Sequence, residues 1–352
     1  MNPDIRSQTK EQLEALFGEW GEPAYRVSQV LAWLYRQRVT DWEAMTNLPK
    51  RLRDKLQAHF SLQSLELVRQ QGSRDSTRKF LWRLSDRSLI ESVLIPASPA
   101  LYGEASDRQT LCVSTQVGCA YGCKFCASGL EGWKRHLRPD EIVEQVLAIE
   151  RVSSSEFRVS SSQPVASPQP EIRNSEPETA NPQPEPRKPK VPARLVDHLV
   201  IMGMGEPLAN YETLLQALRI RNAPWGGGIG ARKITVSTSG LAPQIRRLAD
   251  EPLRCRLAVS LHGATDETRN RIMPVNRKFP LRELTDACVY YQEKKGRMIT
   301  LEYILIAGVN DHAAAVRPLA ALARKLRTSN AMWLSSMCCD SWPSGTPTRP
   351  TP

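Results

Sequence analysis

The chain has 352 residues and 41% of them are apolar, so it can bury the core of one large domain with a smaller domain beside it. Its 48 Lys and Arg against 37 Asp and Glu give a formal net charge of +11, which favours a polyanionic partner only if a site also demands one. The opening residues, MNPDIRSQTKEQLE, are polar and no uncharged apolar run reaches about 18 residues, so we expect a cytoplasmic protein without a secretory signal or membrane span.

Residues 1–95 predict a small accessory domain of helices followed by strands. Apolar residues recur at helical spacing before residue 62, in EQLEALF, VSQVLAWLY and LPKRLRDKLQAHF, the last of which is basic. Alternating polar and apolar residues predict an antiparallel meander over 64–95, in SLELVRQQ, RKFLWRL and SLIESVLIP. The basic helix is either a solvated surface or a nucleic-acid-docking surface, and the sequence leaves both interpretations open.

A different pattern covers residues 105–337. Strand-like runs alternate there with helix-like runs, the strand-like ones being TLCVST, LVDHLVIMG, KITVSTSG, RCRLAVSLH, MITLEYILI and AMWLSSM. This alternation predicts βα units around a parallel sheet. The expected fold class is therefore α/β, a partial (β/α)6 TIM-like barrel with the helical and β accessory domain at its N-terminal side.

Two stretches break this pattern. Residues 152–193 hold nine prolines among Ser, Gln, Glu and Asn, which predicts a disordered insertion, with a Pro-rich recognition segment as the alternative. Residues 338–352 have neither helical nor strand periodicity, so we predict an atypical unstructured tail.

Three of the eight cysteines, Cys119, Cys123 and Cys126, lie directly after a predicted strand at spacing C-x3-C-x2-C. Iron–sulfur clusters and zinc both accept thiolates, but structural zinc takes four protein ligands, and no second C-x2-C or histidine partner follows. Three thiolates fit a [4Fe-4S] cluster with one open iron. An open iron can bind S-adenosylmethionine (SAM) through its amino and carboxylate groups, and an electron then cleaves SAM to a 5′-deoxyadenosyl radical.

The cysteine spacing resembles the signature of radical SAM enzymes, and further segments resemble the RlmN/Cfr methyltransferases in matching order. They are CVSTQVGCAYGCKFCASG, GMGEPLAN, ITVSTSGLAP, LAVSLHGATDETRNRIMPVNRK, LIAGVND and the N-terminal YRVSQVLAWLYRQRVTDWEAMTNLPKRLRDKL. The resemblance covers about residues 10–327 without the insertion. It implies methylation of C2 or C8 of an adenine in 23S ribosomal RNA, with transfer RNA as a second candidate substrate. It also implies a monomer with an RNA-docking accessory domain and a flavodoxin or ferredoxin-type electron donor.

The resemblance assigns the SAM site to strand ends. Gly205 and Glu206 follow the second strand, Ser237 ends the third, and Ser260, Leu261 and His262 end the fourth. Without the resemblance, GMGEP is an ordinary strand-end turn and His262 an ordinary strand-end histidine with its hydrogen bonds satisfied.

Three catalytic roles also follow from the resemblance. A carrier cysteine accepts a methyl group from one SAM, a second SAM activates that methyl, and the carbon radical adds to the adenine. Cys112 matches the cysteine that resolves the resulting adduct, and Glu91 matches the proton acceptor. On pattern alone, Cys112 is a small core residue and Glu91 an exposed carboxylate.

The carrier itself is expected near the C-terminus, where only Cys338 and Cys339 occur, in the unfamiliar context SSMCCDSWPSG. Two alternatives therefore stand beside the methyltransferase prediction. One is a radical SAM enzyme acting on another substrate. The other is a C-terminally degenerate RNA-binding homologue that cannot transfer methyl.

Overall fold

The computed structural model describes residues 2–72, 77–97, 107–160, 194–326 and 331–334. The first of these segments contains the predicted helices, α1 (Lys10–Glu19), α2 (Tyr25–Ala32) and α3 (Lys50–His59). Helix α1 begins with a capping box in which the Thr9 side chain accepts from the Gln12 N–H and the Gln12 side chain accepts from the Thr9 N–H. The helices predicted from apolar spacing are thus confirmed.

One nine-stranded sheet runs through the rest of the molecule in the order β1-β2-β3-β4-β7-β8-β9-β10-β11. Its antiparallel part is the predicted meander, β1 (Glu66–Gln71), β2 (Arg78–Arg83) and β3 (Leu89–Pro96). Strand β3 pairs antiparallel with β4, which begins the parallel part. The parallel strands are β4 (Gln109–Cys112), β7 (His198–Ile201), β8 (Ile234–Thr238), β9 (Arg256–Ser260), β10 (Thr300–Ile304) and β11 (Ala331–Leu334).

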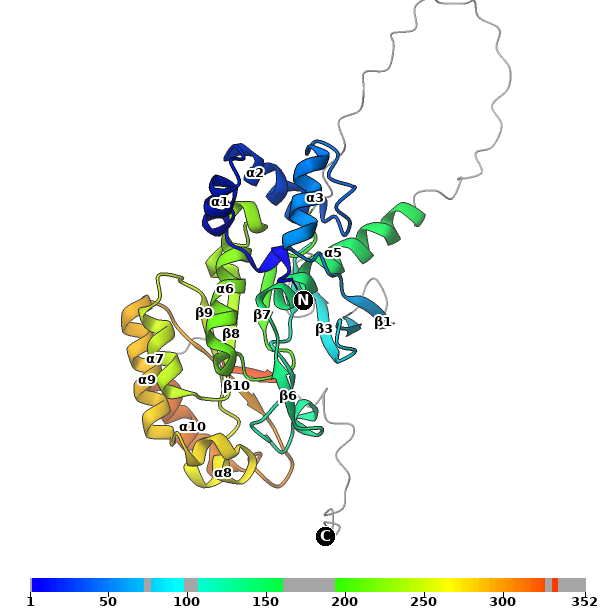
Figure 1. The fold of residues 1–352 in the computed structure, drawn as a ribbon. Helices are drawn as coiled ribbons and strands as arrows, with labels where there is room; N and C mark the ends of the chain where they lie inside the picture. The colour runs from blue at the N-terminus through cyan, green and yellow to red at the C-terminus, as the bar shows by residue number, and fades with distance from the viewer. Residues whose placement is uncertain (1, 73–76, 98–106, 161–193, 327–330, 335–352) are drawn as a thin grey trace, which may run out of the picture.

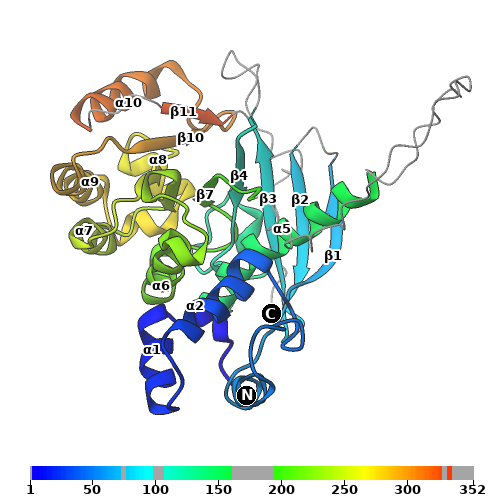
Figure 2. The ribbon, with the colours of Figure 1, turned by 90° about the horizontal axis from the view of Figure 1, so that it is seen from above.

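Helices between the parallel strands cover one side of the sheet (Figures 1 and 2). They are α5 (Pro139–Ser160), α6 (Tyr211–Asn222), α7 (Ala242–Asp250), α8 (Asp266–Ile272), α9 (Leu281–Lys295) and α10 (Ala313–Lys325). The sheet does not close on itself, and the α/β prediction of a partial (β/α)6 barrel with an N-terminal accessory part is confirmed. Within the described residues, no helix is long and apolar enough to cross a membrane.

Helix α5 extends into the segment 152–193 that the sequence predicts to be disordered. The helix continues to Ser160. The beginning of the segment is held by packing, because Ser153 is buried and Arg78 of β2 donates to the Ser153 hydroxyl at 3.4 Å. The remainder of that segment and the predicted tail at 338–352 lie outside the described residues.

The strand register divides the sheet into two chemically different faces. Side chains alternate along a strand, so residues paired directly across strands share a face. One face is apolar and packs into the core under the helices, with Leu111, Leu199, Val236, Leu257 and Leu301 at most 1% exposed. The opposite face, here called the open face, carries Glu91, Cys112, Ser237, Ser260 and Glu302.

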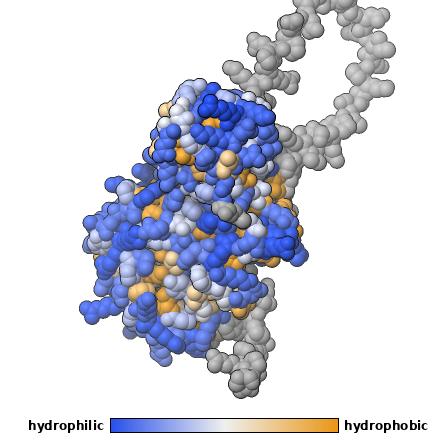
Figure 3. Space-filling model, viewed as in Figure 1, coloured by the Kyte–Doolittle hydropathy of each residue, from blue (hydrophilic) through white to orange (hydrophobic). Residues whose placement is uncertain are grey.

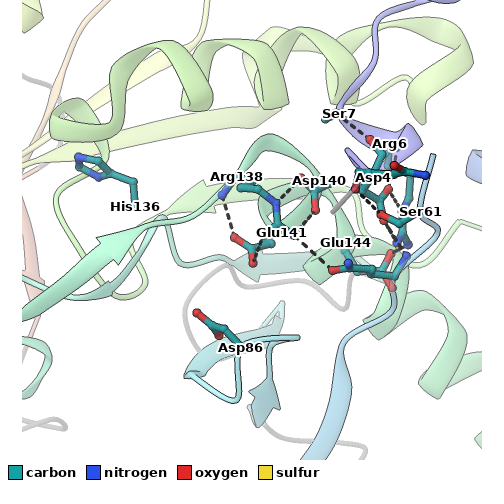
Figure 4. A network of polar contacts seen from close by, with 12 residues as sticks. Asp4, Arg6, Ser7, Ser61, Asp86, His136, Arg138, Asp140, Glu141 and Glu144 are labelled. Atoms are coloured by element: carbon teal, nitrogen blue, oxygen red, sulfur yellow. Dashed lines mark hydrogen bonds and ion pairs between the residues drawn. The ribbon is translucent and has the colours of Figure 1, made fainter. Parts of the chain in front are cut away.

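Buried ion pairs join the N-terminal segment to helix α5 (Figure 4). The Arg6 guanidinium pairs with Asp4 at 2.9 Å and with Glu144 of α5, and all three side chains are at most 3% exposed. Arg38, which ends the turn after α2, pairs with Glu150 further along α5 at 2.8 Å. The accessory helices are therefore fastened to the barrel through charges withdrawn from water.

Replacing Arg6 with Met is expected to lower the free energy of unfolding by about 3–5 kcal/mol, because Asp4 and Glu144 would remain buried without a counter-charge. Urea denaturation followed by circular dichroism measures this loss. Lys10→Met is the matched control, since its pair with Glu14 is exposed and such pairs contribute about 0.3–0.5 kcal/mol. Equal losses in the two variants would contradict the account.

Candidate active site

The carboxyl ends of β8, β9 and β10 meet at one edge of the open face. Ser237 is 8% exposed near the end of β8, and Ser260 ends β9. The main chain just beyond is fixed to β10, because the Glu302 carbonyl accepts from the N–H groups of Leu261 at 2.9 Å and His262 at 3.2 Å. Ligand sites of parallel α/β sheets lie at such strand ends.

The turn that contains Gly205 and Glu206 follows β7 and packs against Gln116 of strand β5 (Gln116–Gly118). Gly205 has φ +101°, and a Cβ there would lie 2.5 Å from the Gln116 Cβ. The Gln116 side-chain oxygen accepts from the Glu206 N–H at 2.8 Å. The turn therefore requires a glycine both for its backbone conformation and for this close approach.

The Glu206 carboxylate is buried and fully engaged inside the protein. It accepts from the Leu208 N–H at 3.1 Å and from both the N–H and the hydroxyl of Ser239 at 2.7 Å. Burial raises its pKa, although these hydrogen bonds act in the opposite direction. The side chain thus ties the turn after β7 to the end of β8.

His262 is neutral and held in an uncommon backbone conformation. Its φ is +50° and its side chain is buried. Burial and the nearby Arg269 lower its pKa to about 3. Its Nδ1 accepts from the Ile304 N–H at 3.1 Å, so the ring proton is on Nε2. Phe125 of the cysteine loop packs edge-on against the ring, with centroids 4.7 Å apart.

The cysteine loop connects β5 to β6 (Trp133–His136) and contacts the residues that follow the strand ends. Gly118 has φ +72°, and a Cβ there would lie 1.9 Å from the Gly132 carbonyl, which accepts from the Cys119 N–H at 3.1 Å. On the other side, the Lys124 N–H donates to the Ile272 carbonyl at the end of α8. The loop is therefore closed at its base and held at its middle.

The three thiols of this loop are half-buried. Burial raises the pKa of Cys119, and raises that of Cys123 to about 12, with the Cys126 thiol adding to both shifts. Protonated thiols lose these protons when they bind a soft metal centre, so the donor set fits an iron–sulfur cluster. In the described part of the chain, however, no three His, Cys, Asp or Glu side chains converge as a ready-made metal site. The cluster therefore stays a prediction.

Two residues that organise the site have roles that the sequence did not predict. Arg269 of α8 is fully buried and donates to the carbonyls of Ser239 at 2.9 Å, Ser260 at 3.0 Å and Leu261. The Asn310 amide donates to the carbonyls of His262 and Ile304 at 2.7 Å. Both lie in segments that carry the family resemblance, ATDETRNR and LIAGVND, but the sequence gives no sign that these polar residues are buried.

The predicted catalytic residues lie further along the open face. The Glu91 carboxylate is 38% exposed and pairs with Lys79 at 2.8 Å. Cys112 is 9% exposed and stands opposite Val93, two residues along β3 from Glu91. Cys338 and Cys339 lie outside the described residues.

A cavity of about 610 Å³ opens elsewhere, at the base of the meander. Its lining includes Ser64, Arg83 and Arg87, and none of the predicted site residues.

On the surface seen in Figure 3, polar side chains dominate, with smaller apolar areas between them.

Two family models match separate parts of this architecture and define the class of protein. The radical SAM superfamily matches residues 187–316, and the ribosomal RNA large subunit methyltransferase N-terminal domain matches residues 4–62. The chain is thus a radical SAM protein with the N-terminal domain of a ribosomal RNA methyltransferase.

Similar proteins define the family more narrowly. A probable dual-specificity RNA methyltransferase, RlmN 3 of Opitutus terrae, is 49% identical over 92% of this chain and 79% of its own length. An RlmN protein of Akkermansia muciniphila is 44% identical over the same shares. The crystal structure of a radical SAM methyltransferase from Sphaerobacter thermophilus superposes with a TM-score of 0.75 at 39% identity, covering 92% of this chain and 82% of that one. The chain belongs to the RlmN family of SAM-dependent radical SAM RNA methyltransferases.

Gly205→Ala is expected to lower the free energy of unfolding by about 1–3 kcal/mol, because the new methyl group meets Gln116 in a backbone conformation that favours glycine. Thermal and urea unfolding both measure this loss. The matched control is Gly18→Ala in α1, where a Cβ meets no atom within 4 Å. That variant is expected to gain about 0.5–1 kcal/mol from helix propensity. A loss in the control but none at Gly205 would refute the role of the turn.

Proposed function

We propose that this protein methylates C2 or C8 of an adenine in 23S ribosomal RNA, with transfer RNA as a second substrate, through a methyl-cysteine intermediate. The observation that carries the proposal is the strand register, which gathers Glu91, Cys112, Ser237 and Ser260 on the open face. Both relatives are named as probable dual-specificity RNA methyltransferases, and the family membership supports extending this dual specificity to the present chain.

The cofactor sites of the proposal follow the strand ends. Cys119, Cys123 and Cys126 would hold a [4Fe-4S] cluster with SAM on its open iron. The SAM site would be formed by Gly205, Glu206, Ser237, Ser260, Leu261 and His262. When bound, the cluster supplies the electron that cleaves SAM, and SAM also supplies the methyl group. The neutral His262 ring offers its Nε2–H as a fixed hydrogen-bond donor, because Nδ1 is already engaged.

The remaining residues act on the RNA. Cys338 or Cys339 would carry the methyl group as a thioether. Glu91 would take the proton from the substituted ring carbon. The Cys112 thiolate would attack the carrier sulfur, forming a disulfide and breaking the sulfur–carbon bond, and the methylene left on the ring would take up a proton to become methyl. The target base has to leave its stack to reach the open face, while the accessory helices bind RNA shape and phosphates. A flavodoxin or ferredoxin-type donor would supply electrons to the monomeric protein.

Anaerobic reconstitution with iron, sulfide and a reductant tests the proposal on ribosomal RNA from a strain that lacks this methylation. The wild type is expected to form 5′-deoxyadenosine and methyladenine, and mass spectrometry of digested RNA distinguishes C2 from C8. Cys119→Ala is expected to form neither product. Cys112→Ala is expected to form 5′-deoxyadenosine and to accumulate protein covalently attached to RNA.

Cys255→Ala is the control, because this buried thiol lies on β9's N-terminal side and packs against Tyr291. It is expected to retain both products. Separate Cys338→Ala and Cys339→Ala variants identify the carrier. If the wild type forms 5′-deoxyadenosine without methyladenine on ribosomal and transfer RNA, the methyltransferase proposal is wrong, and either the degenerate homologue or a radical SAM enzyme with another substrate replaces it.

A further inference from the structure

A carboxylate oxygen on β10 is buried without a hydrogen-bond partner. Three buried side-chain oxygens in the described residues have none, namely Thr115 Oγ1, Gln244 Oε1 and Glu302 Oε1, and only Glu302 is ionisable. Its residue is 6% exposed. Leaving a polar acceptor unpaired in the interior costs about 1–3 kcal/mol, and more if it is charged. An oxygen in this position is typical of a site completed by a ligand.

The other Glu302 oxygen is already fixed. Ser260 Oγ donates to Oε2 at 2.9 Å, and the two residues are direct partners in the β9–β10 ladder. This contact sets the rotation of the carboxylate and leaves Oε1 as the free acceptor. The register places it on the open face with Ser237 and Ser260, at the strand ends where the proposed SAM site lies. Its carbonyl meanwhile holds the main chain of Leu261 and His262.

The chemistry of SAM limits what can donate to this oxygen. In the proposed site, the amino and carboxylate groups of SAM would bind an iron held by the cysteine loop, so the amino group would not be available as a donor to β10. The sulfonium has no proton to donate. The ribose hydroxyls and the adenine amino group remain. A carboxylate that accepts from ribose hydroxyls is a recurrent solution at strand ends of nucleotide-binding sheets.

We propose that Glu302 is a SAM-binding residue whose Oε1 accepts a hydrogen bond from a ribose hydroxyl, while Ser260 fixes its orientation through Oε2. This inference rests on the proposed SAM site and adds a residue that the family resemblance does not assign. The buried carboxylate then favours SAM over analogues that lack the ribose hydroxyl, because only a hydroxyl can donate to Oε1.

Equilibrium dialysis of the anaerobically reconstituted holoprotein with SAM, 2′-deoxy-SAM and 3′-deoxy-SAM tests the inference without relying on turnover. For the wild type, removing the contacted hydroxyl is expected to raise Kd by about 10-fold to 100-fold, the effect of a hydrogen bond to a charged group. Glu302→Met is expected to raise the Kd of SAM by a similar factor. In that variant, removing the hydroxyl is expected to change Kd less than twofold, because the two changes delete the same interaction.

Stability without SAM separates ligand binding from a structural role. Glu302→Met keeps the side-chain length and removes a buried polar group, so the thermal midpoint is expected to stay equal or rise. The surface variant Glu293→Leu on α9 is the control and is expected to change neither Kd nor the midpoint. If Glu302→Met fails to fold, Glu302→Gln and the wild-type comparison of the deoxy analogues still decide the question.

The outcomes distinguish this inference from the proposed function. A wild type that does not bind SAM overturns both. A wild type that binds SAM and both deoxy analogues equally overturns the ribose contact alone. Equal losses of affinity for all three ligands in Glu302→Met also overturn it, because the carboxylate would then act on adenine or on the fold.

Discussion

The alternation of side chains along one continuous sheet is the constraint on which the rest of the molecule depends. Strands β4, β8, β9 and β10 contribute apolar residues to the helix-covered face and polar residues to the open face, so the core and the site are built from alternate positions of the same strands. A shift of one residue in any strand would exchange the two sets. The antiparallel meander follows the same rule, which is how Glu91 reaches the face that carries Cys112.

The strand ends are held by internal hydrogen bonds rather than left free for ligands. Arg269 donates to the carbonyls of Ser239, just beyond β8, and of Ser260, which ends β9. Asn310 donates to the carbonyl of Ile304, which ends β10. The Glu206 carboxylate is used in the same way between β7 and β8. A site fixed before the ligand arrives avoids part of the ordering cost of binding. A polar atom that remains without an internal partner, such as Glu302 Oε1, is consequently the informative one.

Periodicity and spacing predicted the barrel, the meander, the helices and the position of the cysteine loop, because each depends on residues close in sequence. Arg269 and Glu302 could not be predicted, because their burial depends on the strands and helices that surround them. The length of α5 was underestimated for the same reason, since Ser153 is stabilised by Arg78 from a distant strand. The assignments of Glu91 and the methyl carrier depend on the family resemblance and stay predictions.

Helix α5 connects the accessory part to the strand backbone beside Glu91 through consecutive residues. Glu144 faces the N-terminal segment and pairs with Arg6, whereas the buried Gln145 accepts from the Ser92 hydroxyl at 2.9 Å and the Ser114 N–H at 2.8 Å. The Ser114 hydroxyl in turn donates to the Glu91 carbonyl at 2.6 Å. One turn of helix therefore sets both the position of the accessory helices and the backbone beside the proposed proton acceptor. RNA held by the accessory helices would consequently meet the open face in a fixed relation to Glu91, without a separate element to align the two parts.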